Sequence, residues 1–287
     1  MIAYYDLTYA LPTYDAVTFC LVAEEERRKR GAHERMDIVL LPDTRSRSLL
    51  WPNTPEDKAQ MMREVVIPML HMLPGSTLTC PEERPAKPVE GSIGWQKFYK
   101  APDMFRCFRA GIRPLRYSAA VADAAAKLIG GPPLVTITLR EAEHWPERNS
   151  NPAAWMLAAE HITNRGYKVM VLRDTYVADK PFGDFTTSPF ASCDLNFRAV
   201  LYQSAVLNMG VNNGPMWLAM ALDVPVLMLK PTTANSSTTG GAAYLASAGL
   251  TKGSQLGVDY QQIVWADDDA ETIIAAFDAW EQARKSA

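Results

Sequence analysis

The turn at residues 212–216 has the residue types that suit anion binding best. It reads Asn212-Asn213-Gly214-Pro215-Met216 and stands between an apolar run of strand length, 205–210, and a segment predicted to continue as a helix to about residue 222. Proline is favoured at the start of a helix, where the first N–H groups have no intrahelical acceptor. Because the helix dipole adds positive charge there, the turn predicts a phosphate-binding helix N-terminus; an ordinary strand–helix–strand crossover with a good cap is the alternative.

Two arginines follow the predicted strand 134–139. Arg140 comes directly after it, and Arg148 and Asn149 lie in the polar loop that leads to the next helix. The guanidinium group is a rigid fork of donors that matches phosphate oxygens, and a strand end directs it toward the place where open α/β sheets bind ligands. We therefore expect these three residues to bind a phosphate group. A weak surface ion pair of Arg140 with a neighbouring glutamate is the alternative.

A second candidate phosphate cradle follows the predicted strand 226–229. Lys230 ends that strand, and the loop 231–241 is rich in hydroxyl residues and ends in glycines. Backbone N–H groups in such a loop can approach an anion closely, so Lys230, Thr239 and Gly240 are further candidate phosphate contacts. A solvated loop is the alternative. The spacing does not fit a Walker motif, which disfavours an ATPase.

Two carboxylates near the N-terminus are candidates for a general base. Asp6 lies at the end of the first predicted strand, and Asp15 lies in the first turn of the helix predicted over 14–30. A base must reach the proton that it removes, and a strand–helix loop of an α/β domain can supply it. Asp15 has an alternative role, since an acidic residue next to Thr13 stabilises a helix N-terminus. Asp174, after the strand 168–172, is a candidate contact for a nucleoside.

The turn at 212–216 and the strand-end Arg140 resemble the donor-binding part of GT-B glycosyltransferases, especially the heptosyltransferase-like and fucosyltransferase-like families. The resemblance covers most of residues 134–280 as a pattern of elements, and 1–75 more faintly. It implies an α/β fold of two facing Rossmann-like domains with mostly parallel sheets. No His-x-Arg-Arg motif of the fucosyltransferases is present, so the resemblance does not indicate GDP-fucose as donor.

The resemblance also implies an activity. A sugar would move from a nucleotide-diphosphate sugar to a glycan or other hydroxyl acceptor, without a metal and with inversion. The base would lie in the first strand–helix loop, where Asp6 and Asp15 stand. The nucleotide sugar would be a co-substrate, and no cofactor is implied. A nucleotide-sugar epimerase or hydrolase, and a non-catalytic module that binds sugar nucleotides or glycans, remain as alternatives.

Composition limits the remaining choices. The chain has 287 residues and a net charge of −3, so nucleic acid is not an expected partner. Four scattered cysteines form no metal-binding or disulfide pattern. We find no signal peptide and no apolar run long enough to span a membrane, and we expect a cytoplasmic protein. The sequence does not indicate an oligomeric state.

Strands and helices alternate along the chain, which predicts parallel sheets. Strands are predicted over 2–7, 37–41, 134–139 and 168–172, besides those already described. The run Gly130-Gly131-Pro132-Pro133 is the best linker candidate, so we expect an acceptor-side domain over 1–130 and a donor-side domain over 131–287. The pattern assigns no clear elements to 76–113, where prolines and glycines are frequent.

Overall fold

A computed structural model describes residues 1–31, 35–44, 54–143, 145–230, 242–247 and 249–286. The chain divides into two compact units. The N-terminal unit comprises Met1–Arg116 with Ala221–Asp223, and the C-terminal unit comprises Tyr117–Met220 with Val224–Ala287. Helix α5 (Ala119–Ile129) precedes the expected boundary at residue 130, but it packs against α8 (Leu195–Ser204), so the compact C-terminal unit begins before it.

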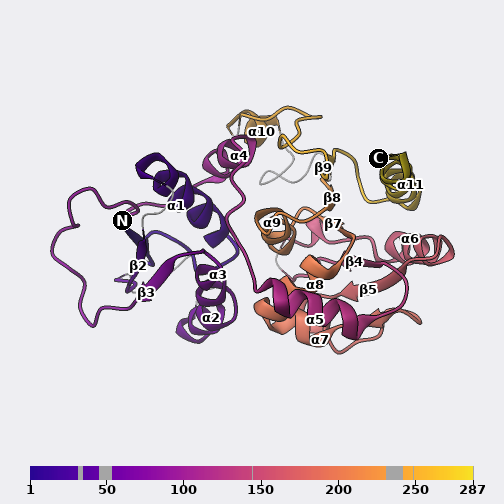
Figure 1. Cartoon of the computed structure of the whole chain (residues 1–287), viewed down its shortest axis with the longest axis horizontal. Helices are drawn as coiled ribbons and strands as arrows, with labels where there is room; N and C mark the ends of the chain where they lie inside the picture. Colours follow the sequence, from indigo (N-terminus) through magenta and orange to yellow (C-terminus); the bar gives the residue numbers. More distant parts are fainter. Residues whose placement is uncertain (32–34, 45–53, 144, 231–241, 248, 287) are drawn as a thin grey trace. The chain divides into compact units, whose positions relative to one another are not determined.

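The N-terminal unit is built on a parallel sheet with the order β1-β2-β3. Its elements are β1 (Ile2–Asp6), α1 (Ala16–Arg30), β2 (Met36–Leu41), α2 (Pro55–Met61), a π-helical turn (Met62–Val66), α3 (Ile67–His71), β3 (Ser76–Thr79) and α4 (Ala101–Arg109) (Figure 1). Helix α1 buries most of its first nine residues and ends in the basic run 27–30, where cations stabilise the negative end of the helix dipole. The strand–helix–strand unit predicted from the sequence is therefore present.

The segment 76–113 contains elements that the sequence did not reveal. Ile93 pairs with Ala3 in a parallel bridge, on the edge of β1 that β2 leaves open. Gly94, at φ 81°, makes this close approach possible, because a Cβ atom there would lie 2.2 Å from the carbonyl oxygen of Tyr4. Strand β3 and helix α4 also lie in this segment. Strand β1 thus has chain on both sides.

The C-terminal unit contains, among the described residues, a six-stranded parallel sheet with the order β6-β5-β4-β7-β8-β9. Its strands are β4 (Leu134–Thr138), β5 (Lys168–Leu172), β6 (Thr186–Thr187), β7 (Leu207–Val211), β8 (Val226–Leu229) and β9 (Gln261–Val264). Its longer helices, besides α5 and α8, are α6 (Pro152–Asn164), α9 (Gly214–Ala221) and α11 (Ala270–Ser286), and shorter ones are α7 (Pro189–Cys193) and α10 (Ala242–Ser247).

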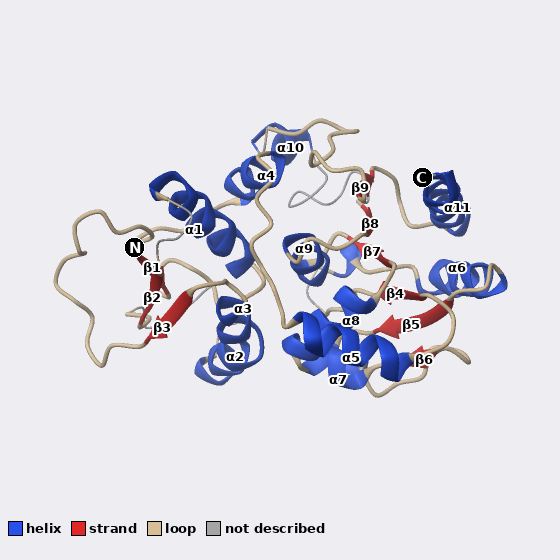
Figure 2. Ribbon diagram, in the orientation of Figure 1, coloured by secondary structure: helices blue, strands red, loops and turns tan. Residues whose placement is uncertain are grey.

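Helices cover both faces of this sheet. Helix α6 packs against α11, and α5 and α7 pack against α8; Figure 2 shows these two groups on opposite sides of the strands. Trp155, Phe277 and Ile273 fill the core between the sheet and the first group. The predicted α/β class with parallel sheets is confirmed.

The strand order identifies the position at which a ligand would bind. Numbered within the unit, the strands run 3-2-1-4-5-6, and the order reverses between β4 and β7. At such a switch point the loops after the two strands separate, and ligands bind at the carboxyl ends of the strands. Gly210 brings β4 and β7 together there, because a Cβ atom on it would lie 2.6 Å from the carbonyl oxygen of Thr138.

Within the described residues, no helix combines the length and the apolar character that crossing a bilayer requires.

Candidate functional site

The turn after β7 forms the helix N-terminus that the sequence predicted. Asn213 is buried, and its Oδ1 accepts a hydrogen bond of 3.0 Å from the backbone N–H of Met216, as an N-cap does. Gly214 begins α9 and Pro215 follows it. Met216 itself is fully buried, so its side chain anchors the helix while the start of α9 faces the switch point. Asn213 therefore caps the N-terminus of α9.

Asn212 offers a polar atom at this position. Its backbone N–H donates to the carbonyl of Leu229 across the sheet at 2.8 Å, which fixes the residue after β7. Its side chain is 5% exposed, and among the described residues no group hydrogen-bonds its Oδ1. Because a buried polar atom without a partner is costly, a ligand that hydrogen-bonds this carboxamide would be stabilising.

Arg140 is the second residue after β4 and is almost fully buried. Its backbone N–H donates to Ser150 Oγ at 2.9 Å, and its Nη1 donates to the carbonyl of Trp145 at 2.9 Å and to Asn149 Oδ1. The alternative of a surface pair with Glu141 is not what the structure shows, since Glu141 pairs with Arg173. Contacts from Trp145, Asn149 and Ser150 therefore hold Arg140 close to the strand end.

Asn149 makes its hydrogen bonds within the loop after β4, and its contact with phosphate stays a prediction. Its Oδ1 accepts from Arg140 and also from the N–H of Ala142 at 3.1 Å, and its Nδ2 donates to the carbonyl of Ala142 at 2.9 Å. The carboxamide is thus engaged within the loop. The geometry favours a positioning role for Asn149, with Arg140 as the residue that it positions, over direct contact with phosphate.

Arg148 links the loop after β4 to the turn after β7. Its Nη2 donates to the carbonyl of Asn212 at 3.4 Å, and its guanidinium lies over the Trp145 ring, 5.7 Å from the ring centroid. The loop after β4 and the turn after β7 therefore both contribute to the position of Arg148. The aromatic ring stabilises the cation without neutralising its charge.

Lys230 adds a third cation at the end of β8. Its side chain is 1% exposed, and Nζ lies 5.7 Å from the centroid of the Trp265 ring. Burial, followed by the positive charge of Arg148, lowers the pKa of Lys230 to about 7. Burial lowers the pKa of Arg140 to about 10, again with Arg148 as the main repelling charge.

These shifts describe a cation cluster, by which we mean Arg140, Arg148 and Lys230. A lowered pKa of a basic group means that its charged form is disfavoured where it stands. An anion placed among the three residues would reverse that effect, and the N-terminus of α9 would add its own attraction. The cation cluster is therefore a candidate site for an anionic ligand.

The structure says less about the other predicted ligand contacts. Thr239 and Gly240 lie outside the described residues, so the cradle expected over 231–241 stays a prediction. Asp174 lies after β5, where its Oδ1 accepts from the N–H of Thr175 at 2.8 Å and begins a short 3₁₀-helix (Thr175–Val177). Its contact with a nucleoside also stays a prediction. In the described part of the chain, no group of three or more His, Cys, Asp or Glu side chains could hold a metal ion.

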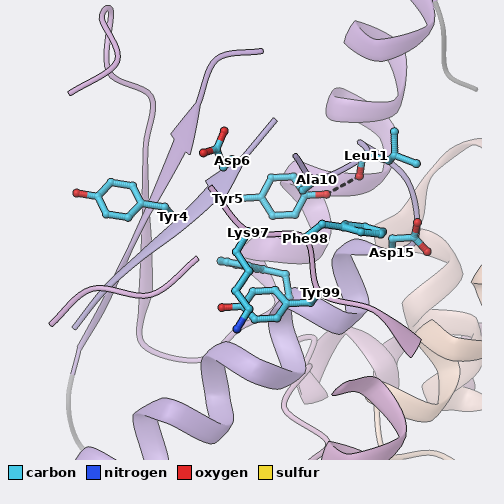
Figure 3. A pocket seen from close by; sticks show the side chains of 10 residues that line it. Tyr4, Tyr5, Asp6, Ala10, Leu11, Asp15, Lys97, Phe98 and Tyr99 are labelled. Atoms are coloured by element: carbon cyan, nitrogen blue, oxygen red, sulfur yellow. Dashed lines mark hydrogen bonds between the residues drawn. The ribbon is translucent and has the colours of Figure 1, made fainter. Parts of the chain in front are cut away.

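The N-terminal unit has a small, open pocket at the carboxyl end of β1 (Figure 3). It is lined by Tyr4, Tyr5, Asp6, Ala10, Leu11, Asp15, Phe19, Lys97, Phe98 and Tyr99. The Tyr5 hydroxyl donates to the carbonyl of Leu11 at 2.7 Å, which fixes the loop after β1. The loop between β1 and α1 and the segment 97–99 therefore line this pocket together.

Asp6 is fully buried and occupied by structural contacts. Arg84 donates to both of its carboxylate oxygens, and the N–H groups of Gln96 and Thr8 donate to them at 3.0 and 3.2 Å. Burial by itself raises the pKa of Asp6, but the hydrogen bonds from Arg84 and these N–H groups outweigh it and lower the pKa. A carboxylate stabilised in this way is a weak base. The geometry favours Asp6 as the anchor of Arg84 and of the segment around Gln96.

Asp15 is the more accessible of the two candidate bases. It is exposed at the start of α1, and Figure 3 shows its carboxylate beside Leu11 and Phe98 in the pocket. Its backbone N–H donates to Thr13 Oγ1 at 3.2 Å, so Thr13 caps this turn as expected. Its charge also acts on Tyr5, whose pKa is raised mainly by burial and next by Asp15. Asp15 is therefore better placed than Asp6 to accept a proton from a ligand.

Sequence reasoning missed several residues of these sites. Arg84, Trp95, Lys97, Trp145 and Trp265 each contact or line one of them. Trp145 could have been found, because it stands in the polar loop that already contained Arg148. The other four lie in segments without a periodic pattern, and nothing in the sequence connects them to a strand end.

Solved glycosyltransferase structures share this fold. ADP-heptose LPS heptosyltransferase II of E. coli aligns with a TM-score of 0.57 at 9% identity, over 99% of both chains. The iron-containing dodecameric glycosyltransferase TibC of enterotoxigenic E. coli aligns at 0.53 and 15%, over 98% of this chain and 76% of that one. A glycosyl transferase family 9 protein of Veillonella parvula aligns at 0.51 and 13%, over 97% of this chain and 96% of that one.

No protein-family model and no curated protein matches the sequence. At identities this low, structural similarity shows the fold alone. It shows that the chain has the GT-B-like fold predicted from the sequence.

Proposed function

We propose that this protein is a glycosyltransferase that moves a sugar from a nucleotide-diphosphate sugar to a hydroxyl group of a glycan or another acceptor. The observation that carries this proposal is the cation cluster at the switch point of the C-terminal unit, next to the N-terminus of α9. A diphosphate carries the multiple negative charge that such a cluster would bind. The glycosyltransferase fold supports the same reading.

The cluster would act mainly on the leaving group. As the bond between the sugar and the diphosphate breaks, its electron pair passes to the diphosphate and negative charge develops there. Arg140, Arg148 and the first N–H groups of α9 are fixed by the protein before the reaction, so they stabilise this charge without reorganising. We infer that they serve in place of a metal ion. Metal independence, inversion and a cytoplasmic location stay predictions.

Asp15 would accept the proton of the acceptor hydroxyl. The acceptor oxygen forms a bond to the anomeric carbon, its proton passes to the Asp15 carboxylate, and the nucleoside diphosphate leaves with the electron pair. Asp6 would hold Arg84 and Gln96 and thereby the wall of the pocket. This assignment keeps the base in the loop between β1 and α1, as the resemblance implied.

The first donors to test are ADP-activated sugars. One of the similar structures is described as a complex of TibC with ADP-D-β-D-heptose, at a TM-score of 0.51 and 15% identity. Asp174 at the end of β5 is our candidate for contact with the nucleoside. The other nucleotides belong in the same test, since the cation cluster recognises the diphosphate and not the base.

The test is a transfer assay with ADP-, UDP-, GDP- and dTDP-sugars and a panel of sugar acceptors, in which release of nucleoside diphosphate and formation of the glycoside are both measured. We expect one donor to react and Arg140→Ala to lower kcat/KM about 10²- to 10³-fold. Arg284→Ala, an exposed arginine of α11 in the same unit, is the matched control and should retain activity.

The outcomes separate the proposal from its alternatives. Release of the diphosphate without any glycoside in the presence of every acceptor would favour a hydrolase. Donor binding without turnover would favour a binding module. Full activity of Arg140→Ala would refute the donor site as described.

A further inference from the structure

Asn212 lies at the switch point, where its backbone is held from two sides. It directly follows β7, and its N–H donates to the carbonyl of Leu229 at 2.8 Å. Its own carbonyl accepts from Arg148 Nη2 at 3.4 Å. These two bonds join the residue to the end of β8 and to the loop after β4. The position of Asn212 is therefore fixed through its backbone.

The side chain of Asn212 lies on the face of the sheet that α9 covers. Successive residues of a strand face opposite sides, and because the N–H of Asn212 still bonds into the sheet, it shares a face with Gly210. A Cβ atom on Gly210 would lie 3.0 Å from Sδ of Met216, in the first turn of α9. Met209 and Val211 face the other side, in the core with α6 and α11. The Asn212 carboxamide is therefore directed toward the start of α9.

This carboxamide contains a buried acceptor that the described residues leave without a hydrogen bond. The residue is almost fully buried, and no group in the described part of the chain donates to its Oδ1. The neighbouring Asn213 differs, because its Oδ1 accepts from the N–H of Met216. A buried acceptor without a partner destabilises the protein, so a donor brought by a ligand would be bound favourably.

The chemistry of the atom limits the partner that it can take. A carboxamide oxygen accepts hydrogen bonds and cannot donate one. The oxygens of an ionised diphosphate are acceptors as well, so a diphosphate could bond to Asn212 only through Nδ2. The Oδ1 atom needs an O–H or N–H group. A nucleotide sugar has such groups close to its diphosphate, in the hydroxyls of the ribose and of the transferred sugar.

We propose that Asn212 Oδ1 accepts a hydrogen bond from a hydroxyl group of the nucleotide sugar, and that Asn212 thereby selects ligands with a hydroxyl at this point. This inference rests on the proposed function. The cation cluster would hold the diphosphate of every such ligand. A ligand that lacks the hydroxyl would bury Oδ1 without a partner and would bind more weakly.

The experiment is isothermal titration calorimetry of the full chain with ADP, GDP and UDP and with ADP-, GDP- and UDP-glucose, each beside its deoxy analogues. The analogues lack one hydroxyl, at position 2′ or 3′ of the ribose or at position 2, 3, 4 or 6 of the glucose. We expect removal of one particular hydroxyl to weaken binding about 5- to 150-fold. The position of that hydroxyl shows whether Asn212 contacts the ribose or the transferred sugar.

Substitutions assign the effect to Asn212. Asn212→Ala should bind the parent ligand and the sensitive deoxy analogue with affinities within about threefold of each other, since the acceptor is gone. Arg140→Ala should weaken binding of both ligands and keep their ratio. Asn164→Ala, an exposed asparagine of α6, is the matched control and should keep both the affinity and the ratio. Because Oδ1 has no partner among the described residues, Asn212→Ala should not lower the unfolding midpoint of the chain without ligand.

The results that would overturn this inference differ from those that would overturn the proposed function. Binding of the parent ligands with no deoxy analogue weaker by more than about threefold overturns the inference and leaves the proposed function standing. An unchanged ratio in Asn212→Ala, or a lowered midpoint with that ratio unchanged, also overturns it. Binding of none of the parent ligands contradicts the proposed function itself. If Asn212→Ala does not fold, Asn212→Leu takes its place, since leucine is of similar size and also lacks the acceptor, and the same ratio decides.

Discussion

The surroundings of buried charged side chains differ between the two units. In the N-terminal unit, Asp6 is surrounded by Arg84 and two backbone N–H groups, all of which favour its charged form. In the C-terminal unit, burial and then the charge of Arg148 disfavour the charged forms of Arg140 and Lys230, although Asp174 and Glu147 partly offset this at Arg140. The pKa is lowered in all three residues, but in an acid this reports a stabilised charge and in a base a destabilised one.

This difference distinguishes the structural role that we infer for Asp6 from the ligand-binding role that we propose for the cation cluster. The contacts of Asp6 are complete, so it needs nothing further and serves to hold the segment 84–96 against β1. The charged forms of Arg140 and Lys230, by contrast, are disfavoured where they stand. Asp6, Arg140 and Lys230 all stand at or just after the end of a strand, so their place in the sheet does not distinguish them. Their electrostatic surroundings do distinguish them.

The largest expected effect separates the two carboxylates of the pocket. Asp15→Asn should lower kcat about 10²- to 10⁴-fold, as loss of a general base does, while its effect on the free energy of unfolding should stay within about 1 kcal/mol. Steady-state kinetics and urea unfolding measure the two quantities. Asp6→Asn is the matched control, and we expect it to reduce stability more than Asp15→Asn does. The reverse pattern would return the role of base to Asp6.

Removal of the partner of Asp6 is expected to have the next largest effect. Arg84→Met leaves a fully buried carboxylate without its counter-ion, which typically costs about 3–5 kcal/mol of stability. Lys97→Met, an exposed cation of the same segment, should cost less than about 1 kcal/mol. Equal effects of the two substitutions in urea unfolding would show that Asp6 does not depend on Arg84.

The smallest expected effect is the loss of the stability contributed by Asp6 at acid pH. Since the folded-state pKa of Asp6 lies below its unfolded value, its contribution to stability is complete above about pH 5 and is lost as pH falls through the folded-state value. The stability difference between the unaltered chain and Asp6→Asn should therefore narrow from pH 5 to pH 2.5. A difference that is constant over this range would contradict the charge assignment of Asp6.

Much of the C-terminal unit could be predicted from the sequence. Apolar runs of strand length between helical patterns indicated β4, β5, β7 and β8, and the turn at 212–216 indicated the N-terminus of α9. Arg140 followed from its place at a strand end. These features depend on neighbours in the sequence. The role of Asn149 could not be predicted in this way, because its hydrogen bond to Arg140 depends on the fold of the whole loop.

The N-terminal unit shows where such prediction stops. Arg84 pairs with Asp6 across 78 positions of sequence, and no local pattern predicts that contact. Ile93 joins the sheet through a single bridge, too short for a strand pattern. Helix α4 could have been found, since Pro102 lies at its start and Asp103 accepts from the N–H of Lys100, a common helix-start arrangement. The frequent prolines of this segment obscured it.

The most direct test of the cation cluster as a diphosphate site is a thermal-shift titration with UDP, GDP, ADP, CMP and dTDP on the unaltered chain, Arg140→Ala and Asn213→Ala. A ligand at a hundred times its Kd adds about 2.7 kcal/mol to stability, which raises the unfolding midpoint measurably. Our account predicts a shift with at least one nucleoside diphosphate, loss of that shift in Arg140→Ala, and a reduced shift in Asn213→Ala. No shift with any nucleotide, or an equal shift in Arg140→Ala, would contradict it.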